Sequence, residues 1–205
     1  MTITVDIIKQ LRSETGAGIM ECRNALEQSG GRYEAALETL QARTMVRAQK
    51  QAEREARQGR IELYSHGGGR IGVMVEVNTE TEFAARSEAF RHFAHELALH
   101  IAAEAPLYVS NEDLPEEVLE ALARDAAEKA RRAGKPERVV ERIVAGVLEK
   151  YRNRHVLLRQ PYFRDEAITV AQMLSRVINQ VGENIVIRRF QRWEITPDAE
   201  TEAGS

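Results

Sequence analysis

The segment Glu76-Val-Asn-Thr-Glu-Thr-Glu-Phe-Ala-Ala-Arg-Ser-Glu-Ala-Phe90 joins a strand pattern to a helix pattern. Residues 71–77 alternate, with Ile71, Val73, Val75 and Val77 on one face and Gly72, Met74 and Glu76 on the other. From residue 90 onward, apolar side chains recur at the spacing of one buried helix face: Phe90, Phe93, Ala94, Leu97 and Ile101. The segment therefore predicts a strand that leads directly into an amphipathic helix.

Phe83 lies in this junction, seven residues before Phe90, and two interpretations of it are open. It is either the first core residue of the helix stripe or an unpaired aromatic side chain displayed to a partner. Residue type alone favours the core, because large aromatic side chains are usually buried.

The sequence around this junction predicts an α+β fold. Residues 61–66 and 71–77 are expected to form a hairpin closed by Gly67-Gly68-Gly69-Arg70. Residues 184–194 are expected to add a strand, which gives a three-stranded antiparallel sheet with helices on one face. The faces of that strand should alternate as Ile185, Ile187, Arg189, Gln191 and Trp193 against Val186, Arg188, Phe190 and Arg192. Thr169 and Gln172 have the spacing of a capping box that begins the preceding helix.

The chain divides into four expected regions. Residues 1–42 read as three short helices with a thin core, the first of them ending at Gly16. Residues 43–60 are expected to be a basic connecting helix or linker, residues 61–195 the core, and residues 196–205 a disordered acidic tail.

Within the core, residues 115–151 read as a helical hairpin joined at Gly134-Lys135-Pro136. Its two expected contact stripes are Val118, Leu119, Leu122 and Ala126 on the first helix, and Val139, Ile143, Val147 and Tyr151 on the second.

The basic stretch from residue 43 to residue 60 has two interpretations. It carries Arg43, Arg47, Lys50, Arg54, Arg57 and Arg60 against only Glu53 and Glu55. A nucleic acid site would lack stacking aromatics here and would bind weakly and salt-dependently, so a solvated helix is favoured.

Composition limits the function classes. The 205 residues include 29 basic and 32 acidic ones, and the net charge of −3 argues against a nucleic acid binder that works by bulk electrostatics. No apolar run is long enough to cross a membrane, and the first residues lack a signal-peptide pattern, so we expect a cytoplasmic protein. The single cysteine, Cys22, suits a reducing compartment.

Enzyme and metal sites are not supported by the spacing of reactive residues. No phosphate-binding loop of the Gly-x-x-x-x-Gly-Lys-Ser/Thr type occurs, and a His-Glu-x-x-His zinc site that starts at His95 would need histidine where Leu99 stands. Cys22 lies on a small helix and is expected to pack in its core rather than act as a nucleophile. We therefore expect no metal, no cofactor and no catalytic residues.

Several motifs, taken in order, resemble one known family. Val77-Asn-Thr-Glu-Thr-Glu-Phe-Ala-Ala-Arg86, Thr15-Gly-Ala-Gly-Ile-Met20, Cys22-Arg-Asn-Ala-Leu26 and Gly182-Glu-Asn-Ile-Val-Ile-Arg-Arg189 are similar to segments of bacterial elongation factor Ts. His95-Glu-Leu-Ala-Leu-His-Ile-Ala-Ala103, Gly134-Lys-Pro136 and Gln160-Pro-Tyr-Phe163 fit between them. The resemblance covers nearly all of the chain except its last ten residues, and the ordered set is highly specific.

The resemblance implies a guanine-nucleotide exchange factor for elongation factor Tu. It implies that a carboxylate-aromatic pair enters the GTPase near its magnesium and phosphate site, so that GDP leaves faster. On this chain the pair is Glu82 and Phe83, with Phe83 as the intruding side chain and Glu82 as the residue that orients it. The family normally has aspartate at the position of Glu82, so the charge is kept but displaced by about one carbon–carbon bond.

Other positions match partner contacts of the family. The resemblance implies a ubiquitin-associated-like fold for residues 1–42, with Arg12, Ile19 and Met20 against the GTPase. The alternative is that Ile19 and Met20 are core residues and that Arg12 is a solvated charge.

Three further matches lie in the core region, and each has a plainer alternative. They are Ile71 as a core strand residue, Gly72 as a strand glycine that permits close approach, and His100 as a histidine on the exposed side of its helix.

Long members of the family carry two versions of the core unit, whereas this chain holds one. We therefore expect a homodimer, formed through the sheet or the hairpin, with two GTPases bound per dimer. The alternative function is a non-catalytic adaptor that binds proteins through its ubiquitin-associated-like bundle.

Overall fold

The computed structural model describes residues 3–195, which form an α+β structure, as the sequence predicts. The helices are α1 (Val5–Thr15), α2 (Ile19–Gln28), α3 (Tyr33–Gln51), α4 (Glu82–Arg86), α5 (Glu88–Glu104), α6 (Glu116–Arg132), α7 (Glu137–His155) and α8 (Val170–Val181), with short 3-10 turns η1 (Asn111–Asp113) and η2 (Leu157–Arg159). The strands are β1 (Gln58–His66), β2 (Ile71–Thr79), β3 (Pro161–Tyr162), β4 (Asp165–Thr169) and β5 (Ile185–Glu194).

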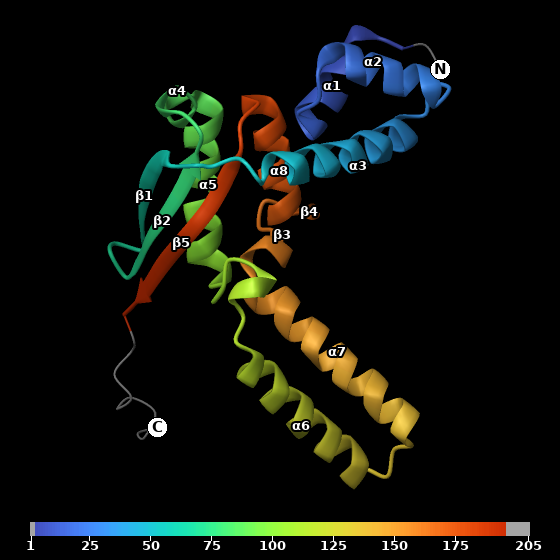
Figure 1. Ribbon diagram of the computed structural model, residues 1–205, viewed down its shortest axis with the longest axis vertical. Helices are drawn as coiled ribbons and strands as arrows, with labels where there is room; N and C mark the ends of the chain where they lie inside the picture. The colour runs from blue at the N-terminus through green and yellow to red at the C-terminus, as the bar shows by residue number, and fades with distance from the viewer. Residues whose placement is uncertain (1–2, 196–205) are drawn as a thin grey trace.

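The main sheet is antiparallel, in the order β1-β2-β5, and helices cover one of its faces. Val73, Val75 and Val77 point inward and are buried, together with Phe90 and Phe93 of α5. Helices α5 and α8 pack against this inner face, and the other face carries no helix (Figure 1). The predicted alternation of β2 and the predicted stripe of α5 are confirmed.

Strand β5 does not alternate regularly, so the predicted faces of this strand are wrong beyond Ile187. A β-bulge interrupts its pairing with β2, because Glu76 pairs with Arg189 whereas the next residue, Val77, pairs with Ile187. The extra residue turns the following side chains over, so that Phe190 packs against the inner core and Trp193 points outward.

The first three helices enclose a small core of their own. Its buried residues are Leu11, Ala17, Cys22, Ala25, Leu26, Ala36 and Leu40. Helix α3 continues past the expected limit at residue 42 and carries buried Thr44 and Ala48 to the core, where it packs against α8 (Figure 1). Strand β1 then begins at Gln58, three residues earlier than the sequence predicts. The expectation for residues 196–205 falls outside the described part of the chain.

Helices α6 and α7 pack on each other and project from the rest of the molecule (Figure 1). The stripe of α6 includes buried Ala126, as predicted. On α7 the expected stripe holds only in part, because Ile143 and Tyr151 are partly buried whereas Val139 and Val147 are exposed and the neighbouring Val140 is buried. Adjacent residues are about 100° apart around a helix, so two stripes one residue apart are both compatible with the sequence pattern. None of the described helices is long and apolar enough to cross a membrane.

Candidate functional site

Phe83 is displayed to solvent, with 86% of its surface exposed. It lies in α4, a helix of five residues that follows β2 directly. The residues after it, Ala84 and Ala85, are buried and fix the helix on the molecule. The core interpretation of Phe83 is therefore wrong. Its aromatic ring is exposed to solvent, whereas the helix that carries it is packed on the molecule.

Hydrogen bonds hold both ends of α4. At its start, the Ala84 amide donates to the Thr81 hydroxyl at 3.2 Å, which makes Thr81 the N-cap. At its end, the Ser87 amide donates to the Ala84 carbonyl at 3.0 Å. Ser87 has extended backbone angles and caps the next helix, α5, through the Phe90 amide. Helices α4 and α5 are thus two separate helices with a break at Ser87.

Glu82 lies beside Phe83 and forms an ion pair along α4. Its carboxylate accepts a hydrogen bond from the Arg86 guanidinium at 2.5 Å, and both side chains are exposed. An exposed pair of this kind stabilises the protein by less than about 1 kcal/mol. Glu82 therefore presents charge next to the ring, whereas the position of the loop is set by other residues.

The loop that leads into α4 is held by Glu183, from the turn between α8 and β5. One carboxylate oxygen accepts from the Thr81 hydroxyl at 2.7 Å. The other oxygen accepts from the Thr81 amide at 2.9 Å and from the Thr79 hydroxyl at 3.1 Å. We call these three hydrogen bonds the Glu183 clamp. Sequence reasoning missed this residue, although the Gly182-Glu-Asn motif that contains it was recognised.

The next residue, Asn184, joins the same loop to the C-cap of α3, Ala52, whose carbonyl accepts from the Asn184 side-chain amide at 3.4 Å, and to the residues that follow. Its amide N–H donates to Glu80 at 2.6 Å, and its side-chain amide donates to the Arg54 carbonyl at 2.6 Å. Arg54 in turn lies 3.6 Å from the Glu80 carboxylate. The segment from which Phe83 projects is therefore tied to the helix that carries the N-terminal bundle.

The three N-terminal site residues lie on the surface of the bundle. Ile19 and Met20 begin α2 and are 56% and 62% exposed, so the alternative that makes them core residues is wrong. Arg12 lies on α1 and is also exposed.

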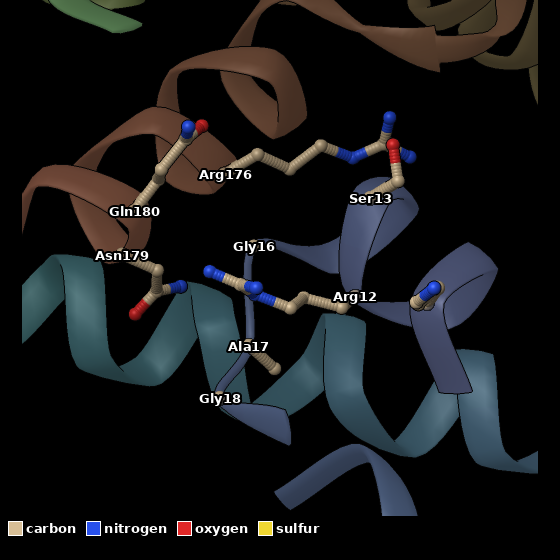
Figure 2. A pocket seen from close by; sticks show the side chains of 9 residues that line it. Arg12, Ser13, Gly16, Ala17, Gly18, Arg176, Asn179 and Gln180 are labelled. Carbon is tan, nitrogen blue, oxygen red and sulfur yellow. The ribbon is translucent and has the colours of Figure 1, made fainter. Parts of the chain in front are cut away.

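A polar cleft of about 460 Å³ separates α1 from α8, and Arg12 projects into it from one side (Figure 2). Arg176 of α8 enters the same cleft from the other wall, where burial lowers the pKa of its guanidinium. Gly16 forms the close contact between the two walls, because a Cβ there would lie 2.5 Å from the Arg176 carbonyl oxygen. The cleft is thus cationic and lies between the bundle and the core.

His100 is fully buried, so the alternative that places it on the exposed side of its helix is wrong. Its Nδ1 accepts from the Phe163 amide at 3.3 Å, which leaves the proton on Nε2 to be donated to Gln160 at 2.9 Å. Burial lowers the pKa of His100. A side chain with no exposed surface supports the core, and a partner has no access to it in this structure.

Ile71 and Gly72 stand at the start of β2, at the other end of that strand from α4. Ile71 is partly buried, and a Cβ on Gly72 would meet no atom within 4 Å. The length of the strand places these two residues about 25 Å from Thr79, at the end of β2 that leads into α4. The structure therefore does not bring them together with the Glu82–Phe83 pair.

The basic residues between positions 43 and 60 mostly face carboxylates of the same chain. Arg47 pairs with Glu21 at 2.5 Å, and Arg60 pairs with Glu62 at 2.6 Å. Paired cations attract phosphates less than free ones do, so the arrangement favours the solvated-helix interpretation.

Comparison with known proteins agrees with the motifs. A family model described as elongation factor TS matches residues 7–177. A curated protein of Coprothermobacter proteolyticus named elongation factor Ts is 47% identical to this chain over 195 residues. The matched region covers 95% of this chain and 99% of that protein. Two further proteins of the same name are each 48% identical to this chain. The one from Caldanaerobacter subterraneus matches over 94% of this chain and 96% of its own length, and the one from Rubrobacter xylanophilus over 95% and 100%.

The chain belongs to the elongation factor Ts family. Membership makes it a translation elongation factor. The residues that are expected to contact the partner in the elongation factor Ts family lie on separate surfaces of this structure. Helix α4 and the bundle formed by α1 and α2 lie toward the same end of the molecule, whereas the turn that precedes Ile71 lies at the opposite end of the sheet (Figure 1).

Proposed function

We propose that this protein accelerates GDP release from elongation factor Tu and that Phe83 enters the GTPase near its magnesium and phosphate site. Family membership supports the partner and the activity. The observation that carries the site is the exposed ring of Phe83 on a helix anchored by Thr81, Ala84 and Ala85. A side chain presented on a fixed support loses little conformational entropy on binding, so more of its contact energy goes into the complex.

The proposed mechanism is electrostatic and needs no chemistry from this chain. A magnesium ion and loop amides hold the diphosphate of GDP, so displacing either removes several charge-assisted contacts together. Phe83 supplies the wedge, and Glu82, which is paired with Arg86 on the same helix, is proposed to orient it. Because the coupling between two ligands is reciprocal, nucleotide binding in turn weakens the grip of the exchange factor.

A second surface of the bundle is proposed to hold the same GTPase. Ile19 and Met20 offer exposed apolar side chains, and Arg12 offers a positive charge close to them in the sequence. Two linked contacts on one partner raise the effective concentration of each, so the N-terminal contact keeps Phe83 close to its target.

The protein is further proposed to be a homodimer that binds two GTPases. The uncovered face of the sheet supports the sheet rather than the hairpin as the interface. Ile61, Leu63, Met74 and Trp193 are exposed on it. An apolar face of this kind is typical of protein interaction surfaces. Gly72 lies on the same face, so in such a dimer it would face the second protomer instead of the GTPase contact that the resemblance implies for it.

The activity is tested by the release of labelled GDP from elongation factor Tu in the presence of excess unlabelled nucleotide. Wild-type protein should accelerate release. In Phe83→Ala the acceleration should be at least about tenfold smaller, which is the effect expected from the loss of a central aromatic anchor. The matched control is Leu107→Ala, which truncates another exposed apolar side chain far along the chain from α4. A folded wild-type protein that binds the GTPase without accelerating release would overturn the proposal in favour of the adaptor.

A further inference from the structure

We propose that Glu183 is a positioning residue for Phe83: its carboxylate fixes the cap of α4 and so sets the direction in which the ring is displayed. The proposal rests on the proposed function, because it names the residue that holds that site in place. Glu183 lies 102 residues from Thr81 in the sequence and reaches it only through the fold.

Helix α4 is too short to be stable without support. Its five residues form little more than one turn, and helix nucleation is unfavourable for so few residues. The ring of Phe83 contributes nothing to anchoring, since it is almost wholly exposed. The direction of the ring therefore depends on the buried Ala84 and Ala85 and on the groups that fix the two ends of α4.

The hydroxyl group of Thr81 connects Glu183 to the helix. A threonine hydroxyl has one proton to donate and lone pairs that accept. Thr81 gives its proton to Glu183 at 2.7 Å, which leaves a lone pair for the Ala84 amide at 3.2 Å. Glu183 thus selects the hydroxyl orientation that caps the helix on which Phe83 stands.

The second carboxylate oxygen fixes the backbone of the same loop. It accepts from the Thr81 amide and from the hydroxyl of Thr79, which is fully buried at the end of β2. Hydrogen bonds to an ionised acceptor are stronger than those between neutral groups. Because two donors of Thr81 and one of Thr79, at the end of β2, converge on one carboxylate, the loop between β2 and α4 has little freedom to turn α4.

The carboxylate is also free of competing partners within the described residues. None of the ion pairs in residues 3–195 includes Glu183, and the nearby Arg54 instead faces Glu80. The negative charge of Glu183 therefore acts on the loop donors and is not neutralised by a cation. This sets Glu183 apart from Glu82, whose charge is paired with Arg86 on the surface.

The test is a double-mutant cycle between Glu183 and Phe83 in the GDP release assay. Glu183→Ala removes all three hydrogen bonds of the clamp and should lower the maximal release rate by at least about tenfold, a loss comparable to the contribution of a single charge-assisted hydrogen bond. The concentration of protein that gives half-maximal acceleration should change little, because the N-terminal contacts are intact. In the Phe83→Ala background, Glu183→Ala should lower the release rate by less than about twofold, because the ring that Glu183 positions is absent. Glu183→Gln, which keeps one acceptor oxygen, should lie between wild type and Glu183→Ala.

The control variant is Glu166→Gln, which removes an exposed carboxylate on β4 that makes none of the described hydrogen bonds or ion pairs. It should leave release unchanged. Equal losses from Glu183→Ala with and without Phe83 would show that Glu183 acts elsewhere and would overturn the proposal, and so would an unchanged release rate.

Amide hydrogen exchange on the protein alone tests the proposal independently of GDP release. In Glu183→Ala the amides of Thr81 and Ala84 should exchange about tenfold faster, whereas the β2 amides keep their protection and show that the fold is intact. Unchanged protection of Thr81 and Ala84 overturns the clamp even if the protein accelerates release. A wild-type protein that fails to accelerate release while the clamp is present contradicts the proposed function alone.

Discussion

At the scale of single residues, Phe83 shows how a small backbone feature changes the role of a side chain. Its spacing from Phe90 fits the stripe of α5, but the chain breaks at Ser87, whose backbone is extended with φ −62° and ψ 148°. The helical phase of α5 therefore does not reach Phe83, and the ring points to solvent instead of into the core.

His100 leads to a prediction about pH. Burial is the main cause of its lowered pKa, while the hydrogen bond to Gln160 and the charge of Glu104 act in the opposite direction. Between the usual histidine value of 6.5 and the lower value in the fold, the unfolded chain binds a proton that the folded protein does not. The contribution of His100 to stability is therefore full above pH 6.5 and is lost as the pH falls below it.

Urea unfolding at pH 8, 7, 6 and 5 measures this effect. Wild-type protein should lose more unfolding free energy between pH 7 and pH 5 than the variant His100→Asn does, although the variant is less stable at pH 8. The comparison between the two proteins removes the contributions of other groups, such as His155, whose pKa is also lowered by burial. Parallel pH profiles would contradict the assigned protonation state.

At the scale of secondary-structure elements, Gly16 joins the bundle to the core. It ends α1 in the left-handed conformation with φ 70°, and its Cα faces the Arg176 carbonyl of α8 so closely that a Cβ would lie 2.5 Å from the oxygen. Gly30 has a similar φ of 64°, but a Cβ there would meet nothing within 4 Å. The two glycines separate the cost of the backbone conformation from the cost of the close contact.

Alanine at these two positions should therefore have unequal effects. Gly30→Ala should cost about 1–2 kcal/mol, the price of a left-handed alanine. Gly16→Ala should cost about 1–3 kcal/mol more, because the packed carbonyl must move as well. Urea unfolding measures both free energies, and equal losses would show that the contact between α1 and α8 yields without strain.

At the scale of the whole molecule, the sheet has one covered and one uncovered face, and the uncovered face predicts self-association. Leu63 and Trp193 are 68% and 69% exposed there. Wild-type protein should sediment at twice the mass of one chain, and Leu63→Arg should sediment at the mass of one chain because it places a charge in the interface.

Leu107→Arg makes the same change at an exposed leucine outside the sheet and should leave the dimer intact. With elongation factor Tu added, the dimer should carry two GTPases. A wild-type monomer at working concentration, in a one-to-one complex, would contradict the dimer.

Local pattern was enough to predict many of the elements. The alternation of β2, the stripe of α5, the left-handed cap at Gly16 and the capping box at Thr169 all follow from residues close together in the chain, and each is present. The bulge in β5 could not be read, because it depends on how two strands separated by more than 100 residues pair. The same applies to α7, where two neighbouring stripes fit the sequence equally well.

The amino-acid sequence was enough to establish the α+β class, the three strands of the main sheet, the family and the position of Phe83 between a strand and a helix, but it did not indicate β3, β4 or the separate helix α4. The folded structure was needed to show that Phe83 is exposed, that His100 is buried, and that Glu183 contacts Thr81. The two groups of features differ in how far apart along the chain the residues that determine them lie. Periodicity and capping act over a few residues and leave a mark in the local sequence, whereas burial and the partner of a buried or clamped polar group depend on segments that only the folded chain brings together.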